Sequence, residues 1–111
     1  MLVMQWVVIF LNDMVKAEFL ALPAEMQASL LKIMELVEAY GLQRVGMPYV
    51  RHIRGKLWEM RGKGRDGIAR SMYVAASGRR VVVVRSFVKK TQQTPEQEIA
   101  LALKRAREIE E

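Results

Sequence analysis

The chain has 111 residues, of which 51% are hydrophobic, and a net charge of +6. This length supports one domain with a single core. The chain has no cysteine, and its one histidine is His52. This composition excludes a disulfide framework, a cysteine nucleophile and a multi-histidine metal centre. We therefore expect a single domain over residues 1–111 that uses neither a metal nor a cofactor.

The positive charge is concentrated in the middle of the chain. Residues 1–43 carry a net charge of −3 and residues 91–111 carry −2, whereas residues 44–90 carry +11. A basic segment between acidic ones is the electrostatic footprint of a protein that binds a phosphate backbone. A cationic surface that only aids solubility is the alternative. The concentration in one segment favours nucleic acid.

The first eleven residues are apolar, but they have the features of neither a signal peptide nor a membrane span. No basic region precedes the apolar stretch and no small-residue cleavage site follows it. It is also too short to cross a bilayer. The pattern predicts a buried strand over residues 3–10 in a cytoplasmic protein that does not act on membranes.

A pair of helices is predicted after this strand. Asn12 or Asp13 can cap a short helix that places Val15 and Phe19 on one face. Further along, apolar residues recur at three- and four-residue spacing over 26–37, which predicts a second helix ending at Gly41. The two helices are expected to form an antiparallel hairpin.

Three strands are predicted in the basic segment. Residues 41–55 contain several glycines and a proline and are expected to be irregular. Strands follow over 56–61, 68–76 and 79–89, separated by the glycine-rich stretch 62–67 and by a tight turn after residue 76. Four consecutive valines over 81–84 indicate a central strand that is buried on both faces. Such short turns require antiparallel neighbours.

A C-terminal helix completes the predicted fold. Thr94, Pro95 and Gln97 form a capping box, and Ile99 and Leu103 begin an apolar face that continues to residue 106. The expected class is therefore α+β, in the order β-α-α-β-β-β-α. A curled antiparallel sheet is packed by an N-terminal helix hairpin and a C-terminal helix.

Cationic side chains recur along the predicted sheet. Strand alternation places Arg61 on the same face as Glu59, and it gives Arg70 an otherwise apolar set of neighbours. Arg85 interrupts an apolar run, and Lys89 lies where the strand leaves the sheet. Each cation alone is compatible with an ordinary solvated side chain. Several on one sheet repel each other unless they bind an anion.

Three segments of this region carry a family resemblance. They are Leu57-Trp58-Glu59-Met60-Arg61, Gly67-Ile68-Ala69-Arg70-Ser71-Met72-Tyr73 and Phe87-Val88-Lys89-Lys90-Thr91-Gln92-Gln93-Thr94-Pro95. In this order and spacing they resemble the phage-derived HigB-like branch of the RelE toxin superfamily. That branch carries an "LWELR"-type strand, a "YR-x-x-Y"-type strand and an "FxKKTxKTP" segment. The resemblance covers residues 5–108 and implies a RelE-like fold.

The resemblance implies the toxin of a type II toxin–antitoxin system. Such a toxin is a ribosome-dependent endoribonuclease (an mRNA interferase) that cleaves messenger RNA by attack of the RNA's own 2′-hydroxyl on the adjacent phosphate. The implied partners are a cognate helix-turn-helix antitoxin of the HigA-like kind, the ribosome and messenger RNA. Contact with DNA is implied only through the antitoxin.

The resemblance also implies roles for individual side chains. Arg70 and Lys90 are expected to stabilise the phosphate in the transition state and Arg61 to position the backbone, since guanidinium forks suit phosphates. Glu59 is the nearest candidate for the general base, with a lysine of lowered pKa as the alternative. The remaining expected RNA-binding residues are Lys56, Lys63, Arg65, Arg85 and Lys89.

Two alternatives to a ribonuclease remain open. A ParE-like toxin that poisons DNA gyrase shares the scaffold without RNA chemistry, because a fold does not determine a function. A weakened or inactive nucleic-acid-binding member of the family would need only the basic surface. The second alternative arises because Ala69 stands where the family usually has a tyrosine, and because the last helix contains neither tyrosine nor histidine.

Overall fold

The structure, a computed structural model, describes residues 5–46, 48–89 and 94–109. In chain order its elements are β1 (Val7–Phe10), α1 (Asp13–Leu20), α2 (Ala24–Tyr40), a short 3-10 helix η1 (Leu42–Arg44), β2 (Val50–Arg54), β3 (Leu57–Gly64), β4 (Gly67–Ala76), β5 (Arg80–Lys89) and α3 (Glu96–Ala106).

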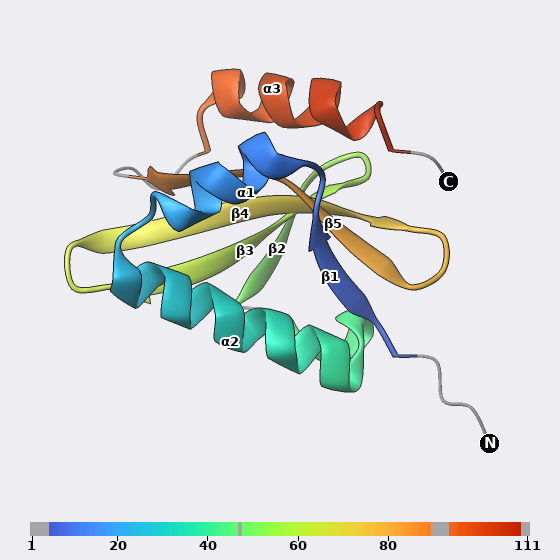
Figure 1. Cartoon of the computed structure of the whole chain (residues 1–111), viewed down its shortest axis with the longest axis horizontal. Coiled ribbons are helices and arrows are strands. Elements are labelled where there is room, and N and C mark those ends of the chain that lie inside the picture. Colours follow the sequence, from blue (N-terminus) through green and yellow to red (C-terminus); the bar gives the residue numbers. More distant parts are fainter. Residues whose placement is uncertain (1–4, 47, 90–93, 110–111) are drawn as a thin grey trace.

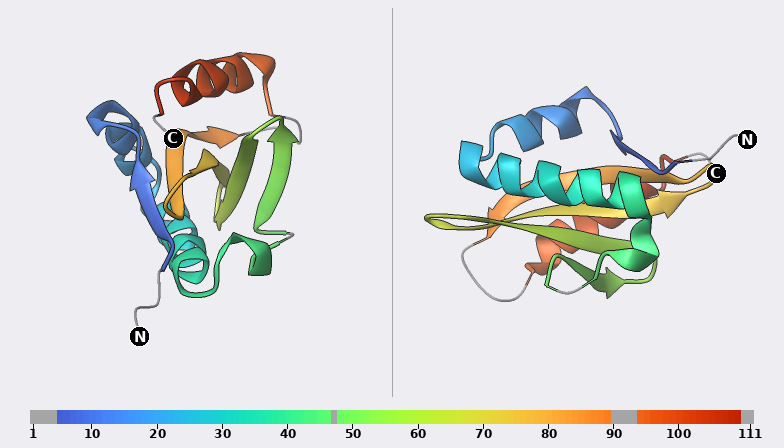
Figure 2. Two further views of the ribbon diagram at one scale, coloured as in Figure 1. Left: turned by 90° about the vertical axis from the view of Figure 1, so that its right-hand side faces the viewer. Right: turned by 90° about the horizontal axis from the view of Figure 1, so that it is seen from below.

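The elements form three layers. The five strands make one sheet in the order β1-β5-β4-β3-β2. Helices α1 and α2 pack on one face of the sheet and α3 packs on the other, as Figures 1 and 2 show. One hydrophobic cluster therefore lies under α1 and α2, and a second lies under α3. The predicted α+β class and the predicted helix hairpin and C-terminal helix are confirmed.

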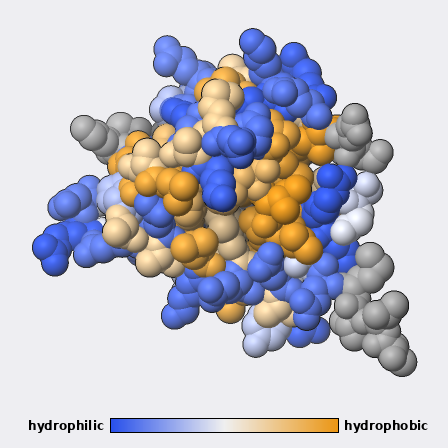
Figure 3. Space-filling view, in the orientation of Figure 1, coloured by the Kyte–Doolittle hydropathy of each residue, from blue (hydrophilic) through white to orange (hydrophobic). Residues whose placement is uncertain are grey.

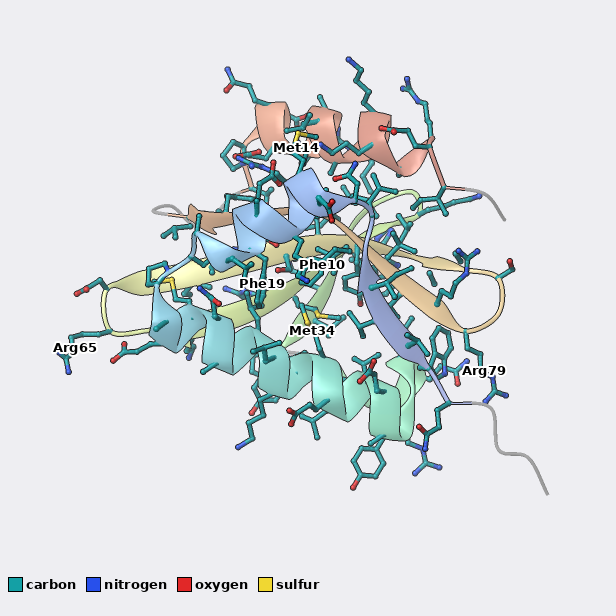
Figure 4. The ribbon with its side chains drawn as sticks, viewed as in Figure 1. Phe10, Met14, Phe19, Met34, Arg65 and Arg79 are labelled. Atoms are coloured by element: carbon teal, nitrogen blue, oxygen red, sulfur yellow. The ribbon has the colours of Figure 1, made fainter. Side chains whose placement is uncertain are left out.

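The first core cluster is centred on α1 and α2. Val15 and Phe19 of α1 are buried as predicted, and the Phe19 ring lies 5.2 Å from that of Phe10 in β1, centroid to centroid. Figure 4 shows these two rings side by side between the helices and the sheet. The side chain of Asn12 accepts the Val15 N–H at 2.9 Å, and α2 ends at Gly41, whose φ is +88°. Both predicted helix ends are thus confirmed.

The sheet differs from the prediction in two respects. First, β1 pairs with β5 in parallel, so the sheet is mixed rather than wholly antiparallel. Second, residues 50–54 form a strand, β2, that pairs antiparallel with β3 inside the stretch predicted to be irregular. The glycines that suggested a loop lie before and after this strand, and Gly55 adopts the positive φ that the turn into β3 needs. Glycine spacing marked the ends of β2 without revealing the strand itself.

Strand β1 is an edge strand and not the buried strand expected. The strand begins at Val7, which is 46% exposed, and Ile9 is 36% exposed. The outward-facing N–H of Val8 donates to the Glu38 carboxylate of α2 at 2.9 Å. A side chain from α2 therefore occupies a backbone donor that an edge strand would otherwise leave open. Figure 3 shows apolar surface on this side of the molecule, interrupted by hydrophilic side chains.

Strand β3 extends three residues beyond its predicted end. It continues through Gly62 and Gly64, which the sequence suggested as turn residues. A Cβ atom on Gly62 would lie 2.6 Å from Leu30 Cγ and 2.9 Å from the Met26 carbonyl oxygen. The glycines thus let α2 pack directly on the strand backbone. Their role is close packing and not a turn.

An ion-pair network attaches α3 and α1 to β5. Arg85 of β5 binds Glu98 of α3 at 2.8 Å and Glu18 of α1 at 3.1 Å. Arg105 of α3 binds Glu18 with both Nη atoms at 2.8 Å and donates to the Val84 carbonyl at 2.9 Å. Arg105 is only 7% exposed, so the network is shielded from solvent at that end. It links α3 to both β5 and α1.

The start of α3 differs from the predicted capping box. The N-cap position is occupied by Pro95, and no side chain caps the helix. Thr94, expected to be the cap, instead donates its hydroxyl to Glu59 of β3 at 2.9 Å. A hydrogen bond to a carboxylate is stronger than one between neutral groups, and it places the Thr94 side chain against β3. In the part of the chain that the structure describes, no helix is long and apolar enough to cross a membrane.

Substituting Gly62→Ala should destabilise the protein by about 1–3 kcal/mol, because the new methyl group overlaps Leu30 and the backbone of α2. Urea unfolding followed by circular dichroism measures the change. Gly46→Ala is the matched control, since nothing lies within 4 Å of its Cβ position. Equal midpoints for the two variants would contradict the packing role of Gly62.

Candidate nucleic-acid site

The α3 face of the sheet carries a group of charged side chains close to the start of α3. Pairing places Arg51 of β2 opposite Glu59 of β3, and Arg61 of β3 opposite Arg70 of β4. Lys89, the last residue of β5, lies on the same face as Arg70, because Phe87 two residues earlier pairs with Arg70. Four adjacent strands thus supply the basic cluster, which consists of Arg51, Arg61, Arg70 and Lys89 around Glu59.

Glu59 is the centre of the basic cluster. Its side chain is 0% exposed, and its Oε2 accepts from Nη1 of Arg70, which is 1% exposed. Its Oε1 accepts the Thr94 hydroxyl, and Nη2 of Arg51 lies 3.8 Å from Oε2. A buried carboxylate and a buried guanidinium are stable only when each satisfies the other. Glu59 therefore fixes Arg70 and also ties the start of α3 to β3.

Lys89 lies at the edge of the same cluster. It is 5% exposed, and its Nζ lies 3.4 Å from the Thr94 hydroxyl oxygen. Burial, together with the positive charge of Arg70, lowers the pKa of the Lys89 ammonium to about 8, and Glu59 opposes this shift. A lysine with such a pKa can exchange a proton near neutral pH.

Two arginine donors in the cluster have no acceptor among the described residues. The Nε–H groups of Arg61 and Arg70 are buried and make no hydrogen bond to any residue that the structure describes. Burial and the Arg70 charge lower the pKa of Arg61, which still keeps its proton because the starting value is so high. Four cations around one carboxylate leave a net charge of +3. Such a surface, with unsatisfied donors, is suited to an anion with several oxygen acceptors.

The other residues expected to bind RNA are spread over the molecule. Lys63 lies near the end of β3, and Arg65 lies at the tip of the β3–β4 hairpin, pointing away from the sheet in Figure 4. Lys56 lies in the β2–β3 turn. Arg85 belongs to the network that holds α3, so the structure does not bring it into the cluster. Lys90 lies outside the described residues.

Two members of the site were missed by sequence reasoning. Arg51 belongs to β2, a strand that the glycine pattern concealed. Thr94 was noticed, but only as a helix cap. The β-branched residues Val50 and Ile53 were a weak signal for β2, because they are three residues apart and do not alternate with period two. No local signal could assign Thr94 to Glu59, 35 residues earlier.

Ala69, the departure from the family pattern, does not lie in the basic cluster. It is 0% exposed, pairs with Gly62 and belongs to the core cluster under α2. A tyrosine ring at this position would enter that core and not the charged face. The substitution therefore removes nothing from the basic cluster directly.

A hollow of about 530 Å³ lies on the face of the sheet opposite the basic cluster. Trp6, Trp58 and Tyr73 contribute its aromatic lining, and most of its other lining residues are apolar. Burial raises the pKa of the Tyr73 hydroxyl, so it stays protonated. Groups able to move a proton near neutral pH and to bind a phosphate lie in the basic cluster, which makes the cluster the better candidate. Within the described ranges, no three His, Cys, Asp or Glu side chains lie together as metal ligands.

Replacing Glu59 by alanine should lower the free energy of unfolding by about 3–5 kcal/mol, because it leaves Arg70 buried without its partner. Glu59→Gln should cost less, since an amide oxygen still accepts a hydrogen bond. Glu96→Ala removes the exposed ion pair with Arg54 and should leave stability unchanged. Chemical denaturation of the three variants tests this order. Similar losses for Glu59→Ala and Glu96→Ala would refute the central role of Glu59.

The comparisons with known proteins agree with a toxin-like fold. A comparison with curated proteins returned no match. Residues 17–107, which include α2, the strands β2 to β5 and α3, match the family described as phage derived protein Gp49-like (DUF891). This family is RelE-like and toxin-like in the broad sense, and it implies an antitoxin partner. Because the match spans most of the chain, the protein belongs to the Gp49-like family of phage-derived proteins.

Proposed function

We propose that this protein is the toxin of a type II toxin–antitoxin pair, and that it cleaves messenger RNA on the ribosome as HigB-like toxins do. The observation that carries the proposal is the basic cluster, where four cations surround one buried carboxylate and two buried Nε–H donors lack acceptors. A phosphodiester under nucleophilic attack gains negative charge on its oxygens, and preorganised cations stabilise that charge.

The proposed reaction is attack of the RNA's 2′-oxygen on the adjacent phosphorus. The bond from phosphorus to the 5′-oxygen breaks, which leaves a 2′,3′-cyclic phosphate and a 5′-hydroxyl that takes its proton from water. Arg61, which is partly exposed, binds the phosphate oxygens, and the buried Arg70 beside it adds its positive charge. Lys89, in its neutral form, accepts the proton of the 2′-hydroxyl. No metal is required in this scheme.

The roles proposed for Glu59 and Lys89 refine the expectation from sequence. Glu59 was the nearest carboxylate and so a candidate base. Its oxygens, however, already accept hydrogen bonds from Arg70 and Thr94, so both are occupied within the protein. We assign Glu59 to positioning Arg70 and assign proton transfer to Lys89. Lys90 remains a proposed phosphate ligand from the family resemblance.

The proposed partners follow the same assignment. A HigA-like helix-turn-helix antitoxin would hold the toxin inactive, and the ribosome would present the messenger RNA. The net charge of +11 over residues 44–90 favours an RNA-rich target, because cations gain affinity for phosphate backbones by releasing counterions.

Induction of the chain in bacteria should arrest growth and produce in-frame cuts in messenger RNA. Arg70→Ala should abolish both effects, since losing one such cation costs about 100- to 1,000-fold in rate. Growth curves and mapped RNA ends measure them together, with Arg79→Ala, in the turn between β4 and β5, as the control. Arrest with intact messages and damaged DNA would instead support a ParE-like gyrase poison. Absence of arrest would indicate an inactive member.

Cleavage should become faster as the pH rises, because the reaction needs neutral Lys89. Its pKa of about 8 means that the neutral fraction increases about tenfold per unit below pH 8 and levels off above it. Single-turnover cleavage of ribosome-bound RNA between about pH 6.5 and 9 tests this. Lys89→Arg keeps the charge but stays protonated, so it should be inactive throughout. A rate that falls with pH, or an active Lys89→Arg, would show that Lys89 acts only as a cation.

A further inference from the structure

A second hollow lies directly beside the basic cluster. It has a volume of about 380 Å³, and we call it the Tyr49 hollow. Its lining residues are Ser29, Pro48, Tyr49, Arg61, Lys63 and Ile68. Arg61 belongs both to this lining and to the basic cluster, so the two sites share a side chain. A ligand that contacts Arg61 in the cluster is therefore next to the hollow.

The backbone fixes Tyr49 against Arg61. The Arg61 N–H donates to the Tyr49 carbonyl at 2.8 Å, which continues the pairing of β2 with β3 past the start of β2. On the far side of the hollow, the Lys63 N–H donates to the Ser29 hydroxyl of α2 at 3.1 Å. The walls of the hollow are thus held by β3 and α2, and the hollow does not depend on loop residues alone.

The lining combines an aromatic ring with cations. The Tyr49 side chain is 50% exposed, so solvent can reach it. Pro48 and Ile68 add apolar surface, while Arg61 and Lys63 add positive charge. A flat aromatic group that is joined to a phosphate needs this combination. The aromatic hollow on the opposite face has Lys56 as its one cationic lining residue and lies away from the basic cluster.

We propose that the Tyr49 hollow binds one unstacked nucleobase of the RNA strand, beside the phosphate held by the basic cluster. The inference rests on the proposed function, because it names how the same substrate is held. Tyr49 stacks on the base, Lys63 contacts the adjoining backbone, and Arg61 links base binding to phosphate binding. Stacking of this kind accepts every base, since each base has a π-face.

The test compares binding of two short single-stranded RNAs to the free protein at low salt. The two differ only at one internal nucleotide, which carries its base in one RNA and is abasic in the other. The RNAs carry 2′-O-methyl groups, so they cannot be cleaved and only binding is measured. Fluorescence anisotropy of an end label gives the two dissociation constants. The wild-type protein should bind the RNA with the base about tenfold more tightly.

The variants assign this preference to Tyr49. Tyr49→Ala should bind both RNAs equally, whereas Tyr49→Phe keeps the ring and should keep the preference. Tyr40→Ala, which removes a 62% exposed ring from the end of α2, is the matched control and should behave as wild type. The inference is overturned if wild-type protein does not distinguish the RNAs, if it binds neither, or if Tyr49→Ala retains the preference.

Cleavage is measured separately on ribosomes with ordinary RNA. If the wild-type protein does not cleave RNA but shows a base preference that depends on Tyr49, the proposed chemistry is overturned and the base site is supported. Cleavage without any base preference in the binding assay would overturn the base site and support the proposed chemistry. The two proposals therefore fail in different experiments.

Discussion

The ion pair between Glu59 and Arg70 is the interaction on which the candidate site depends. Both side chains, one from β3 and one from β4, are almost wholly buried. If either is lost, water cannot solvate the charge of the other. The pair also reduces repulsion within the cluster, because one carboxylate lies among four cations. The second carboxylate oxygen of Glu59 accepts a hydrogen bond from Thr94, and this bond connects the sheet to the segment before α3. One carboxylate thus organises a surface built for anions.

The position of α3 decides which part of the sheet stays available. The network of Glu18, Arg85, Glu98 and Arg105 attaches the helix to β5 and α1, and the apolar half of the face is covered as a result. The charged half lies beside the start of the helix. Arg85 illustrates the division, because it binds Glu18 and Glu98 on the two helices, whereas Arg70 binds Glu59 within the basic cluster. Arg85 therefore holds the helices in place, and Arg70 belongs to the site.

The opposite face shapes the site indirectly. Because Gly62 and Gly64 allow α2 to approach, β3 continues past Arg61 and carries Lys63 out beside Ser29 of α2. This extension forms one wall of the Tyr49 hollow. Close packing on one face of the strand thus produces a recess next to the basic cluster.

The sequence by itself determined the α+β class, the start of α1 at Asn12 and the end of α2 at Gly41. It also determined the buried valine strand and the concentration of cations in residues 44–90. These features depend on local periodicity, capping and composition, which act between near neighbours. The tertiary structure alone decided that β1 runs parallel to β5, that β2 exists, and that Thr94 bonds to Glu59 instead of capping α3. It also decided that Arg51 joins the cluster while Arg85 does not. Each of these outcomes depends on residues that are distant in the chain and that meet only in the folded protein. A local sequence pattern cannot show which strand edge or which buried charge such a residue will pair with.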